Sequence, residues 1–329
     1  MRHSHPRPHL FHILFFIYTY VKITKKERLA RIMKKKIIKK IIIYLFILIL
    51  LILLSVAFYF LFVDRETKDP ENISDLCNIN IDYFKNRKIF TVSPKETDKT
   101  DYTILYFHGG SYMAEATNDY WDFIQKISLD TNSTVIMPDF PLAPKDDYID
   151  VFEMIEPFYN DLVTKVDTNS LIVMGDSSGG GLALSLMEKI SECDNPQVPE
   201  KIILLSPWLD ARLNNPEIAE YQKKDPQLHK SSLKFAGYSY AGGKDGVNSY
   251  LVSPIDGDVS KLKNITIFIG TNDIMNPDVH LMKEKAEAQN VLIDIKEYEN
   301  AGHIWFIENN SDKQLIEKGY NDLLEVICK

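Results

Sequence analysis

The segment Leu171-Ile-Val-Met-Gly-Asp-Ser-Ser-Gly-Gly180 joins four apolar residues to a glycine-rich turn, and the stretch GLALSLMEKI follows directly. The apolar run predicts a buried β-strand, and the stretch after it predicts a helix. Gly175, Ser177 and Gly179 form the pattern G-x-S-x-G at this strand–turn–helix junction. A serine there must occupy a tight turn, and its neighbours must lack side chains to avoid collision. The pattern predicts Ser177 as a nucleophile; the alternative is a glycine-rich helix entry with no catalytic part.

Short apolar runs alternate with longer amphipathic stretches on both sides of this segment. The expected buried strands are Thr103–Phe107, Thr134–Met137, Leu171–Met174, Ile202–Leu205 and Ile265–Ile269, with Leu292–Glu297 as a sixth and Lys88–Val92 as a weaker edge candidate. The expected helices are Asp119–Ser128, Tyr148–Val166, Gly181–Ser191, Pro277–Gln289 and Asp312–Ile327. This alternation predicts an α/β fold, with a mostly parallel sheet and helices on both of its faces.

Residues 64–329 have an ordinary length for one large domain of this kind. Catalytic groups in such sheets gather at the carboxyl ends of the strands. The segments Glu71–Arg87 and Ala211–Lys244 do not fit the alternation of strands and helices. We expect both of them to cover the site as a small lid.

A second glycine-rich turn, His108-Gly-Gly-Ser111, follows the expected strand Thr103–Phe107. The backbone N–H groups of Gly109 and Gly110 can point at a developing oxyanion, together with the N–H group of Ser178. A tight turn without a catalytic part is the alternative. The position of the turn, at the end of a strand that precedes the nucleophile strand, favours an oxyanion hole.

A serine nucleophile needs a histidine base, and the base needs a carboxylate that orients it. His303 lies in a loop between the last expected strand and the final helix, whereas His280 falls inside a helix and His229 precedes the candidate acid. Asp273 follows the strand Ile265–Ile269, and its rival Asp278 is expected at a helix start. The order serine, acid, histidine therefore predicts a triad of Ser177, Asp273 and His303.

The motifs HGG at 108–110, GDSSGG at 175–180, GTND at 270–273 and AGHIWF at 301–306 resemble the hormone-sensitive-lipase-like branch of the α/β-hydrolase esterases. Three more segments are similar to motifs of that family: Asp139–Pro144, Ser206–Asp210, and Tyr240–Gly243 with Ser253–Ile255. The resemblance covers about residues 88–329.

This resemblance implies an α/β-hydrolase fold with a small helical lid, a small ester substrate with a short acyl chain, and neither metal nor organic cofactor. It implies Ser177 as nucleophile with Asp273 and His303, and Gly109, Gly110 and Ser178 as oxyanion donors, with His108, Gly175 and Gly179 as supporting motif residues.

The chain departs from the family pattern at Ser111, where the family usually has glycine, and at Ser178, where it usually has alanine. We expect the oxyanion hole to survive both changes, since the backbone N–H groups remain. Two alternatives stay open: a serine peptidase on the same fold, and a non-catalytic binding protein on a hydrolase scaffold.

Ile41–Val63 is 23 residues long, and Ser55 is its only clearly polar member. As a helix it would rise about 35 Å, enough to cross a hydrocarbon core of about 30 Å. Five lysines precede it within 34–40, while Asp64, Arg65 and Glu66 follow it. The positive-inside rule predicts a single-pass anchor in the cell membrane, with residues 1–40 in the cytoplasm and residues 64–329 outside. A cleaved signal peptide is the alternative, and translation from Met33 would remove residues 1–32.

The formal net charge of −8 hides two opposite parts of the chain. Residues 1–63 carry 12 basic and one acidic side chain, a balance of +11, and residues 64–329 carry −19. The acidic part would repel phosphates, which excludes a nucleic-acid binder. The three cysteines, Cys77, Cys193 and Cys328, have no spacing typical of metal ligands, and we expect small buried side chains at these positions.

Overall fold

The computed structural model describes residues 9–63, 65–71, 73–96, 100–308 and 311–329. Residues 1–8 of the expected cytoplasmic segment, Asp64 of the outer flank and Asn72 of the first expected lid segment lie outside this description. The chain divides into two compact units, Met1–Val63 and Asp64–Lys329.

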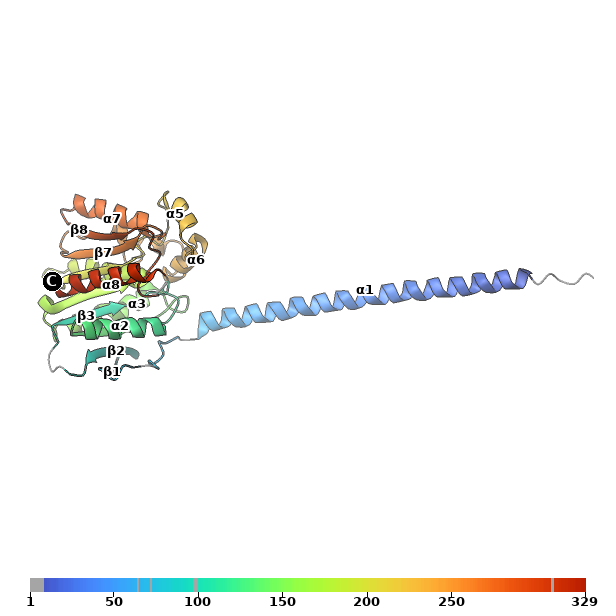
Figure 1. Cartoon of the computed structure of the whole chain (residues 1–329), viewed down its shortest axis with the longest axis horizontal. Coiled ribbons are helices and arrows are strands. Elements are labelled where there is room, and N and C mark those ends of the chain that lie inside the picture. Colours follow the sequence, from blue (N-terminus) through green and yellow to red (C-terminus); the bar gives the residue numbers. More distant parts are fainter. Residues whose placement is uncertain (1–8, 64, 72, 97–99, 309–310) are drawn as a thin grey trace, which may run out of the picture. The chain divides into compact units, whose positions relative to one another are not determined.

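The first unit is one helix, α1 (His9–Phe62), of 54 residues (Figure 1). It begins 32 residues before the predicted span, because the intervening residues contain neither proline nor glycine and include many good helix formers. Within it, Phe15–Tyr59 holds an 18-residue window with a mean hydropathy of 3.3, none of it buried by protein. By length and composition, α1 is a candidate membrane span or signal anchor.

The second unit is built on an eight-stranded sheet with the strand order β1-β2-β4-β3-β5-β6-β7-β8 (Figure 1). The pairs β1–β2 and β2–β4 are antiparallel, and all other neighbours are parallel. The strands are β1 (Cys77–Phe84), β2 (Arg87–Pro94), β3 (Tyr102–Phe107), β4 (Ser133–Pro138), β5 (Leu171–Asp176), β6 (Lys201–Leu205), β7 (Ile265–Gly270) and β8 (Ile293–Tyr298). The predicted mostly parallel sheet is confirmed.

The expectation that Glu71–Arg87 forms part of a lid is wrong. Cys77–Phe84 is the edge strand β1, which pairs with β2 from Cys77 opposite Pro94 to Phe84 opposite Arg87. Its sequence, CNINIDYF, alternates apolar and polar residues, and most of its side chains are at least partly exposed. A short edge strand with Asn and Asp on its solvent face carries a weak strand signal, because these residues are rare in strands.

Helices cover both faces of the sheet. The helices of this unit are α2 (Asn118–Asp130), α3 (Tyr148–Leu162), α4 (Ser177–Ser191), α5 (Ile218–Lys224), α6 (Lys230–Tyr240), α7 (Asn276–Ala288) and α8 (Lys313–Cys328). Side chains of α3, α4 and α7 belong to one hydrophobic cluster, and those of α2 and α8 belong to the other. Neighbouring strand residues alternate between the two clusters, as Leu105 and Ile104 do, because successive side chains of a strand point to opposite faces.

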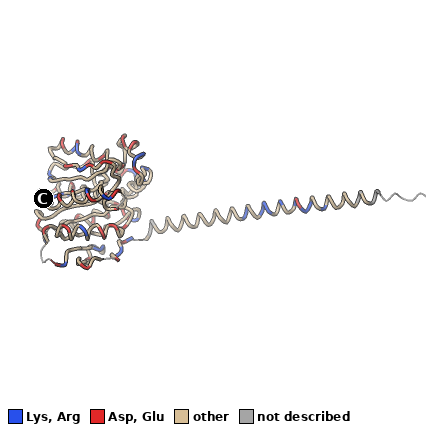
Figure 2. The backbone as a smooth tube through the Cα atoms, in the orientation of Figure 1, with Lys and Arg blue, Asp and Glu red and all other residues tan. Residues whose placement is uncertain are grey.

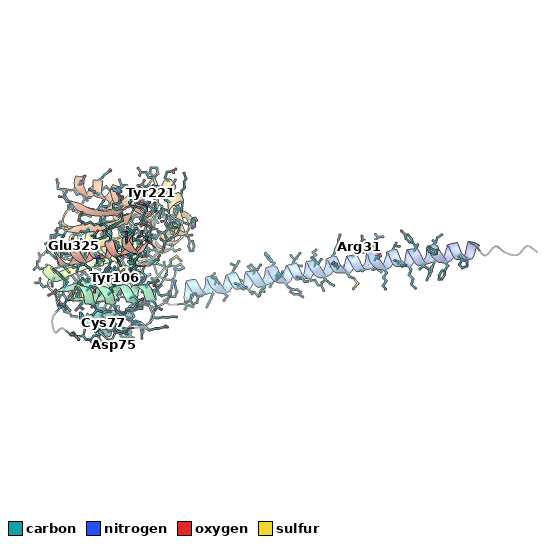
Figure 3. The ribbon with its side chains drawn as sticks, in the orientation of Figure 1. Arg31, Asp75, Cys77, Tyr106, Tyr221 and Glu325 are labelled. Atoms are coloured by element: carbon teal, nitrogen blue, oxygen red, sulfur yellow. The ribbon has the colours of Figure 1, made fainter. Side chains whose placement is uncertain are left out.

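Two local predictions need correction. Helix α4 begins at Ser177 and not at Gly181, because the glycine-rich turn is itself the first turn of the helix. Of the three cysteines only Cys77 is buried, whereas Cys193 and Cys328 are exposed at the ends of α4 and α8. Figure 3 labels Cys77 on its strand.

The loops that carry the predicted site residues all follow parallel strands of the sheet. The segments that begin at His108, Ser177 and Thr271 follow β3, β5 and β7, and the loop with His303 follows β8. These four parallel strands end at the same edge of the sheet, where loops from different strands can meet.

Candidate active site

Ser177 lies at the junction of β5 and α4 with a φ of 51°, in the left-handed region that a residue with a side chain rarely adopts. A Cβ atom at Gly175 would lie 2.3 Å from the carbonyl oxygen of Gly179, and one at Gly179 would lie 2.1 Å from that of Phe107. Any side chain at either glycine would therefore clash with backbone. The two glycines allow the strained turn that presents Ser177.

Ser177, His303 and Asp273 form a continuous chain of hydrogen bonds. Nε2 of His303 lies 2.9 Å from Oγ of Ser177, and Nδ1 lies 2.9 Å from Oδ2 of Asp273. The other carboxylate oxygen of Asp273 accepts a hydrogen bond from the backbone N–H of Met275 at 2.9 Å. All three side chains are buried. The structure thus brings together the three residues that the sequence order singled out.

The charges around His303 favour its protonated form. Burial by itself would lower the pKa of His303, but the charge and hydrogen bond of Asp273, with the charges of Asp225 and Asp176, outweigh burial and raise it. An imidazole held this way accepts a proton from a serine hydroxyl more readily, because the resulting imidazolium is stabilised.

The other candidates for the base and the acid lie outside the hydrogen-bonded chain of Ser177, His303 and Asp273. His280 is exposed on α7, where it bonds to Glu297 at 2.9 Å, and His229 is the N-cap residue of α6. Asp278 lies in the first turn of α7, as predicted, but it is buried, and neither of its carboxylate oxygens has a hydrogen-bond partner among the residues that the structure describes.

The turn after β3, residues 109–112, is called the oxyanion loop here. Its first predicted donor is already engaged, since the N–H group of Gly109 donates to Oδ1 of Asp176 at 2.9 Å. Within the described part of the chain, the N–H groups of Gly110 and Ser111 have no acceptor. The prediction of Gly109 as an oxyanion donor is therefore corrected. The third position of the turn, Ser111, has the free N–H group instead.

Asp176 connects this loop to the nucleophile turn. Besides Gly109, its carboxylate accepts hydrogen bonds from the hydroxyls of Tyr106 at 2.6 Å and Tyr120 at 2.8 Å. Burial raises the pKa of Asp176 to about 6, although these hydrogen bonds act in the opposite direction. Figure 3 labels Tyr106 inside the domain.

His108 has a packing position. Its ring stacks on Phe140 with centroids 4.7 Å apart, and its Nδ1 lies 2.7 Å from the carbonyl oxygen of Gly109. Burial lowers the pKa of His108 to about 4, so the ring is neutral at physiological pH. The His108 side chain is thus held between Phe140 and the backbone of the oxyanion loop.

The second predicted lid segment, Ala211–Lys244, contains α5 and α6 and contacts the site at its middle and near its C-terminal end. Oδ2 of Asp225 accepts from the backbone N–H of Ile274 at 3.0 Å, next to Asp273. Tyr240, at the end of α6, stacks on Tyr112 of the oxyanion loop with centroids 3.7 Å apart and planes 3° from parallel. A cavity of about 510 Å³ lies between this segment and the loop; its lining includes Ser111, Met113, Gln227, His229, Leu233 and Phe235.

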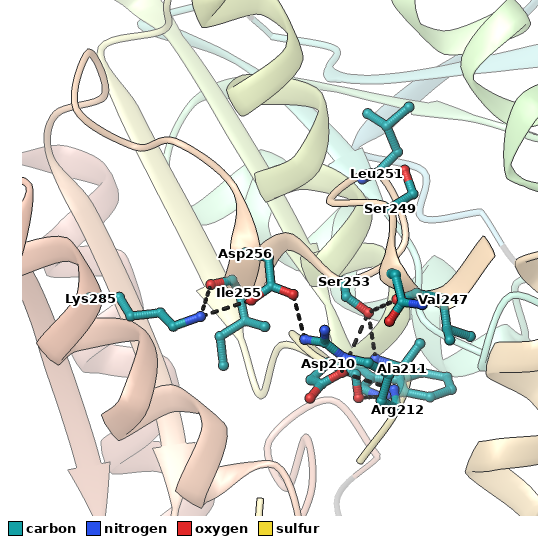
Figure 4. Close-up of polar contacts among 12 residues, drawn as sticks. Asp210, Ala211, Arg212, Val247, Ser249, Leu251, Ser253, Ile255, Asp256 and Lys285 are labelled. Carbon is teal, nitrogen blue, oxygen red and sulfur yellow. Dashed lines mark hydrogen bonds and ion pairs between the residues drawn. The ribbon is translucent and has the colours of Figure 1, made fainter. Parts of the chain in front are cut away.

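The start of the lid segment is fixed by a cluster of charged residues (Figure 4). Asp210 accepts from Nε of Arg212 at 2.6 Å, and Nη2 of Arg212 lies 2.6 Å from Asp256. Lys285 of α7 binds the same carboxylate at 2.8 Å, and the Ser253 hydroxyl donates to the carbonyl oxygen of Val247 at 2.7 Å. The motifs at 206–210 and 253–255, which are far apart in the sequence, are thus joined in one network.

Within the described residues, no group of three or more His, Cys, Asp or Glu side chains is placed to hold a metal ion. The groups gathered at this edge of the sheet are a buried serine, a histidine, two carboxylates and free backbone N–H groups. They define a site of the serine-hydrolase class, in which a nucleophile, a base, an orienting acid and oxyanion donors converge.

Comparison with known proteins agrees with this class. Residues 104–307 match the family described as having the alpha/beta hydrolase fold. An esterase of Acinetobacter venetianus is 28% identical over 197 residues, which is 59% of this chain and 64% of the esterase. An acetyl-hydrolase of Streptomyces hygroscopicus is 22% identical over 62% of this chain and 68% of its own length. The chain thus spans about two thirds of each of these two relatives.

Solved structures share the fold. A candidate esterase of Staphylococcus aureus superposes with a TM-score of 0.74 at 26% identity, covering 80% of this chain and 88% of the other. An esterase from the bacterial hormone-sensitive lipase family gives a TM-score of 0.70 at 21% identity, covering 78% and 84%. This chain belongs to the α/β-hydrolase family. Its superposition on an esterase of the hormone-sensitive lipase family shows that the two proteins share this fold.

Proposed function

We propose that this protein is a serine carboxylic-ester hydrolase that acts through an acyl-enzyme. One observation carries the proposal: the hydrogen-bonded chain Ser177–His303–Asp273, with 2.9 Å at each step. The esterase and acetyl-hydrolase relatives support ester hydrolysis as the reaction class.

The geometry gives each residue a part in the reaction. Oγ of Ser177 attacks the ester carbonyl carbon while Nε2 of His303 takes the hydroxyl proton, and Asp273 stabilises the imidazolium. The N–H groups of Gly110, Ser111 and Ser178 bind the negative oxygen that forms. The carbonyl then re-forms, and the alcohol leaves with the proton from His303. Water attacks the acyl-enzyme by the same route and releases the carboxylic acid.

A short acyl chain is part of the proposal. The named activities of the Streptomyces acetyl-hydrolase and of a yeast steryl acetyl hydrolase, 23% identical over 75% of this chain, support it. The cavity beside Ser111 would then receive the alcohol part of the ester. A peptidase on the same fold would use the same triad, so the substrates must separate the two.

We further propose that Ile41–Val63 anchors the enzyme in the cell membrane, with residues 64–329 outside. Figure 2 shows Lys and Arg gathered in one stretch of α1 and none in its C-terminal part. The five lysines at 34–40 directly before the span, against only Arg65 and Lys68 close after it, support this orientation by the positive-inside rule.

The test measures the hydrolysis of p-nitrophenyl acetate by the full-length protein in detergent solution. Ser177→Ala should lower kcat by about 10³-fold or more, because the nucleophile is lost. Ser185→Ala is the matched control: Ser185 is buried in the same helix, and its hydroxyl donates to the carbonyl oxygen of Gly181 at 3.0 Å.

A fluorophosphonate probe should label the native protein and the control but not Ser177→Ala. Full activity in Ser177→Ala would refute the assignment, and absence of labelling in the native protein would favour a non-catalytic binding role. Hydrolysis of peptide amides that is lost in Ser177→Ala would favour the peptidase, because an amide has a poorer leaving group than an ester and a simple esterase cleaves it very slowly.

A further inference from the structure

We propose that the side-chain hydroxyl of Ser178 is a positioning group that holds the oxyanion loop in its active conformation. This inference rests on the proposed function, because it concerns the same site. The backbone N–H group of Ser178 is a separate feature, and a side-chain substitution leaves it in place.

The contact is direct and shielded from water. Oγ of Ser178 accepts a hydrogen bond from the backbone N–H of Tyr112 at 3.2 Å. Ser178 is fully buried and Tyr112 is 2% exposed. Water therefore cannot replace this acceptor easily, and its removal would leave a buried N–H group without a partner.

The contact also has a counterpart on the other side of the nucleophile. Asp176 accepts from Gly109 at the start of the loop, and Ser178 accepts from Tyr112 at its end. The two anchors are the immediate neighbours of Ser177 in the chain. They enclose Gly110 and Ser111, whose free N–H groups we assign to the oxyanion. The distance from nucleophile to donors is thus set by a short segment of backbone.

The loop needs such an anchor because its backbone is strained. Ser111 has a φ of 56° and Tyr112 a φ of 61°, so two consecutive residues with side chains lie in the left-handed region. That region is unfavourable for any residue with a Cβ atom. Without the bond to Ser178, the loop can relax towards ordinary backbone angles, and the N–H groups of Gly110 and Ser111 would turn away from the oxyanion.

The first measurement is on Ser178→Ala, a change that removes one oxygen atom and needs no extra space. We expect kcat per active site, counted by fluorophosphonate titration, to fall about tenfold, the effect of one buried donor left without a partner. KM should change little, because the donors act on the transition state. The affinity for a trifluoromethyl ketone, whose adduct carries an oxyanion, should fall by a similar factor. Ser185→Ala should show none of these changes.

A second variant tests the mechanism. In a Ser111→Gly background the left-handed conformation costs less, so Ser178→Ala should reduce kcat by a clearly smaller factor than in the native background. An equal reduction in both backgrounds would overturn the role assigned to the strained loop. A purely structural role would lower the amount of titratable enzyme or its Tm without changing kcat per site.

The outcomes separate the two proposals. If the native enzyme does not hydrolyse the ester, the proposed function fails first. If the native enzyme is active, Ser177→Ala is inactive, and Ser178→Ala keeps the native kcat and ketone affinity, only the role of the Ser178 hydroxyl is refuted.

Discussion

At the scale of single residues, the sequence predicted which side chains meet but not which backbone groups remain free. The triad residues follow from the order of motifs along the chain, because strand ends in a parallel sheet share one edge. The choice between Gly109 and Ser111 as oxyanion donor depends on the Asp176 side chain, which takes up the N–H group of Gly109. The sequence of the turn, HGGS, does not predict this hydrogen bond between Gly109 and Asp176.

The role of Asp225 was also missed, because its contact with the loop of Asp273 joins residues that are far apart in the sequence. Its buried carboxylate accepts from the N–H groups of Gln227 and Leu228 at 2.8 and 2.9 Å and from Ile274 at 3.0 Å. It thereby links the lid segment to the loop that carries Asp273. A local signal would have been the Asp-x-Gln-Leu turn, in which an aspartate caps the N–H groups that follow it.

Asp225 provides a prediction about pH. Its charge helps to raise the pKa of His303, so Asp225→Asn should lower that pKa. The neutral imidazole is the base, and activity appears as the pH rises through its pKa. The acid limb of the kcat/KM profile should therefore move to lower pH. Asp245→Asn, which changes an exposed carboxylate directly after the lid segment, is the control. An unchanged acid limb in Asp225→Asn would contradict the assignment.

At the scale of elements, buried strands and long amphipathic helices were predicted to within a few residues, whereas the edge strand β1 was not predicted. Strands β3, β5, β6 and β7 are continuous apolar runs because both of their faces are covered. Strand β1 has one solvated face, and its alternation of apolar and polar residues is a strand pattern that is weakened by Asn and Asp, which are rare in strands. The early start of α4 escaped prediction because three consecutive glycines, Gly179–Gly181, disfavour a helix and are tolerated only where close packing needs them.

Helix α7 begins with a buried carboxylate that should make stability depend on pH. Burial raises the pKa of Asp278 to about 7, with a further increase from the charge of Asp210, although the positive charges of Arg212 and Lys230 lower it. The helix N-terminus also favours a negative charge, but by only about 1 kcal/mol. Burial therefore dominates, and the folded protein holds this proton more tightly than the unfolded chain does.

The consequence is a loss of stability as the pH rises from about 4 to about 7, since the native state binds more protons there. Asp278→Asn removes this loss. At pH 8 it should increase the free energy of unfolding by up to about 4 kcal/mol, three pKa units at 1.36 kcal/mol each. Urea unfolding of the full-length protein at pH 4 and pH 8 measures it. At pH 4 the variant and the native protein should be nearly equal, and a difference that does not depend on pH would contradict the explanation.

At the scale of the whole molecule, composition and motifs predicted two parts of opposite charge, one apolar and one catalytic. The boundary between the two compact units falls after Val63, which is the residue where the apolar run ends. The family assignment came from several short motifs in a fixed order, each of which is weak by itself. The extent of α1 could not be predicted from hydropathy, because a helix continues through charged residues as readily as through apolar ones.

The cysteines give this topology a built-in reporter. The chain has three, and the two exposed ones, Cys193 and Cys328, both belong to the catalytic unit. A membrane-impermeant maleimide added to intact cells should label these two thiols if the catalytic unit faces outward. Labelling only after the cells are opened would place that unit inside. Buried Cys77 should react only after denaturation, so a single mass spectrum would test both the proposed orientation in the membrane and the integrity of the fold.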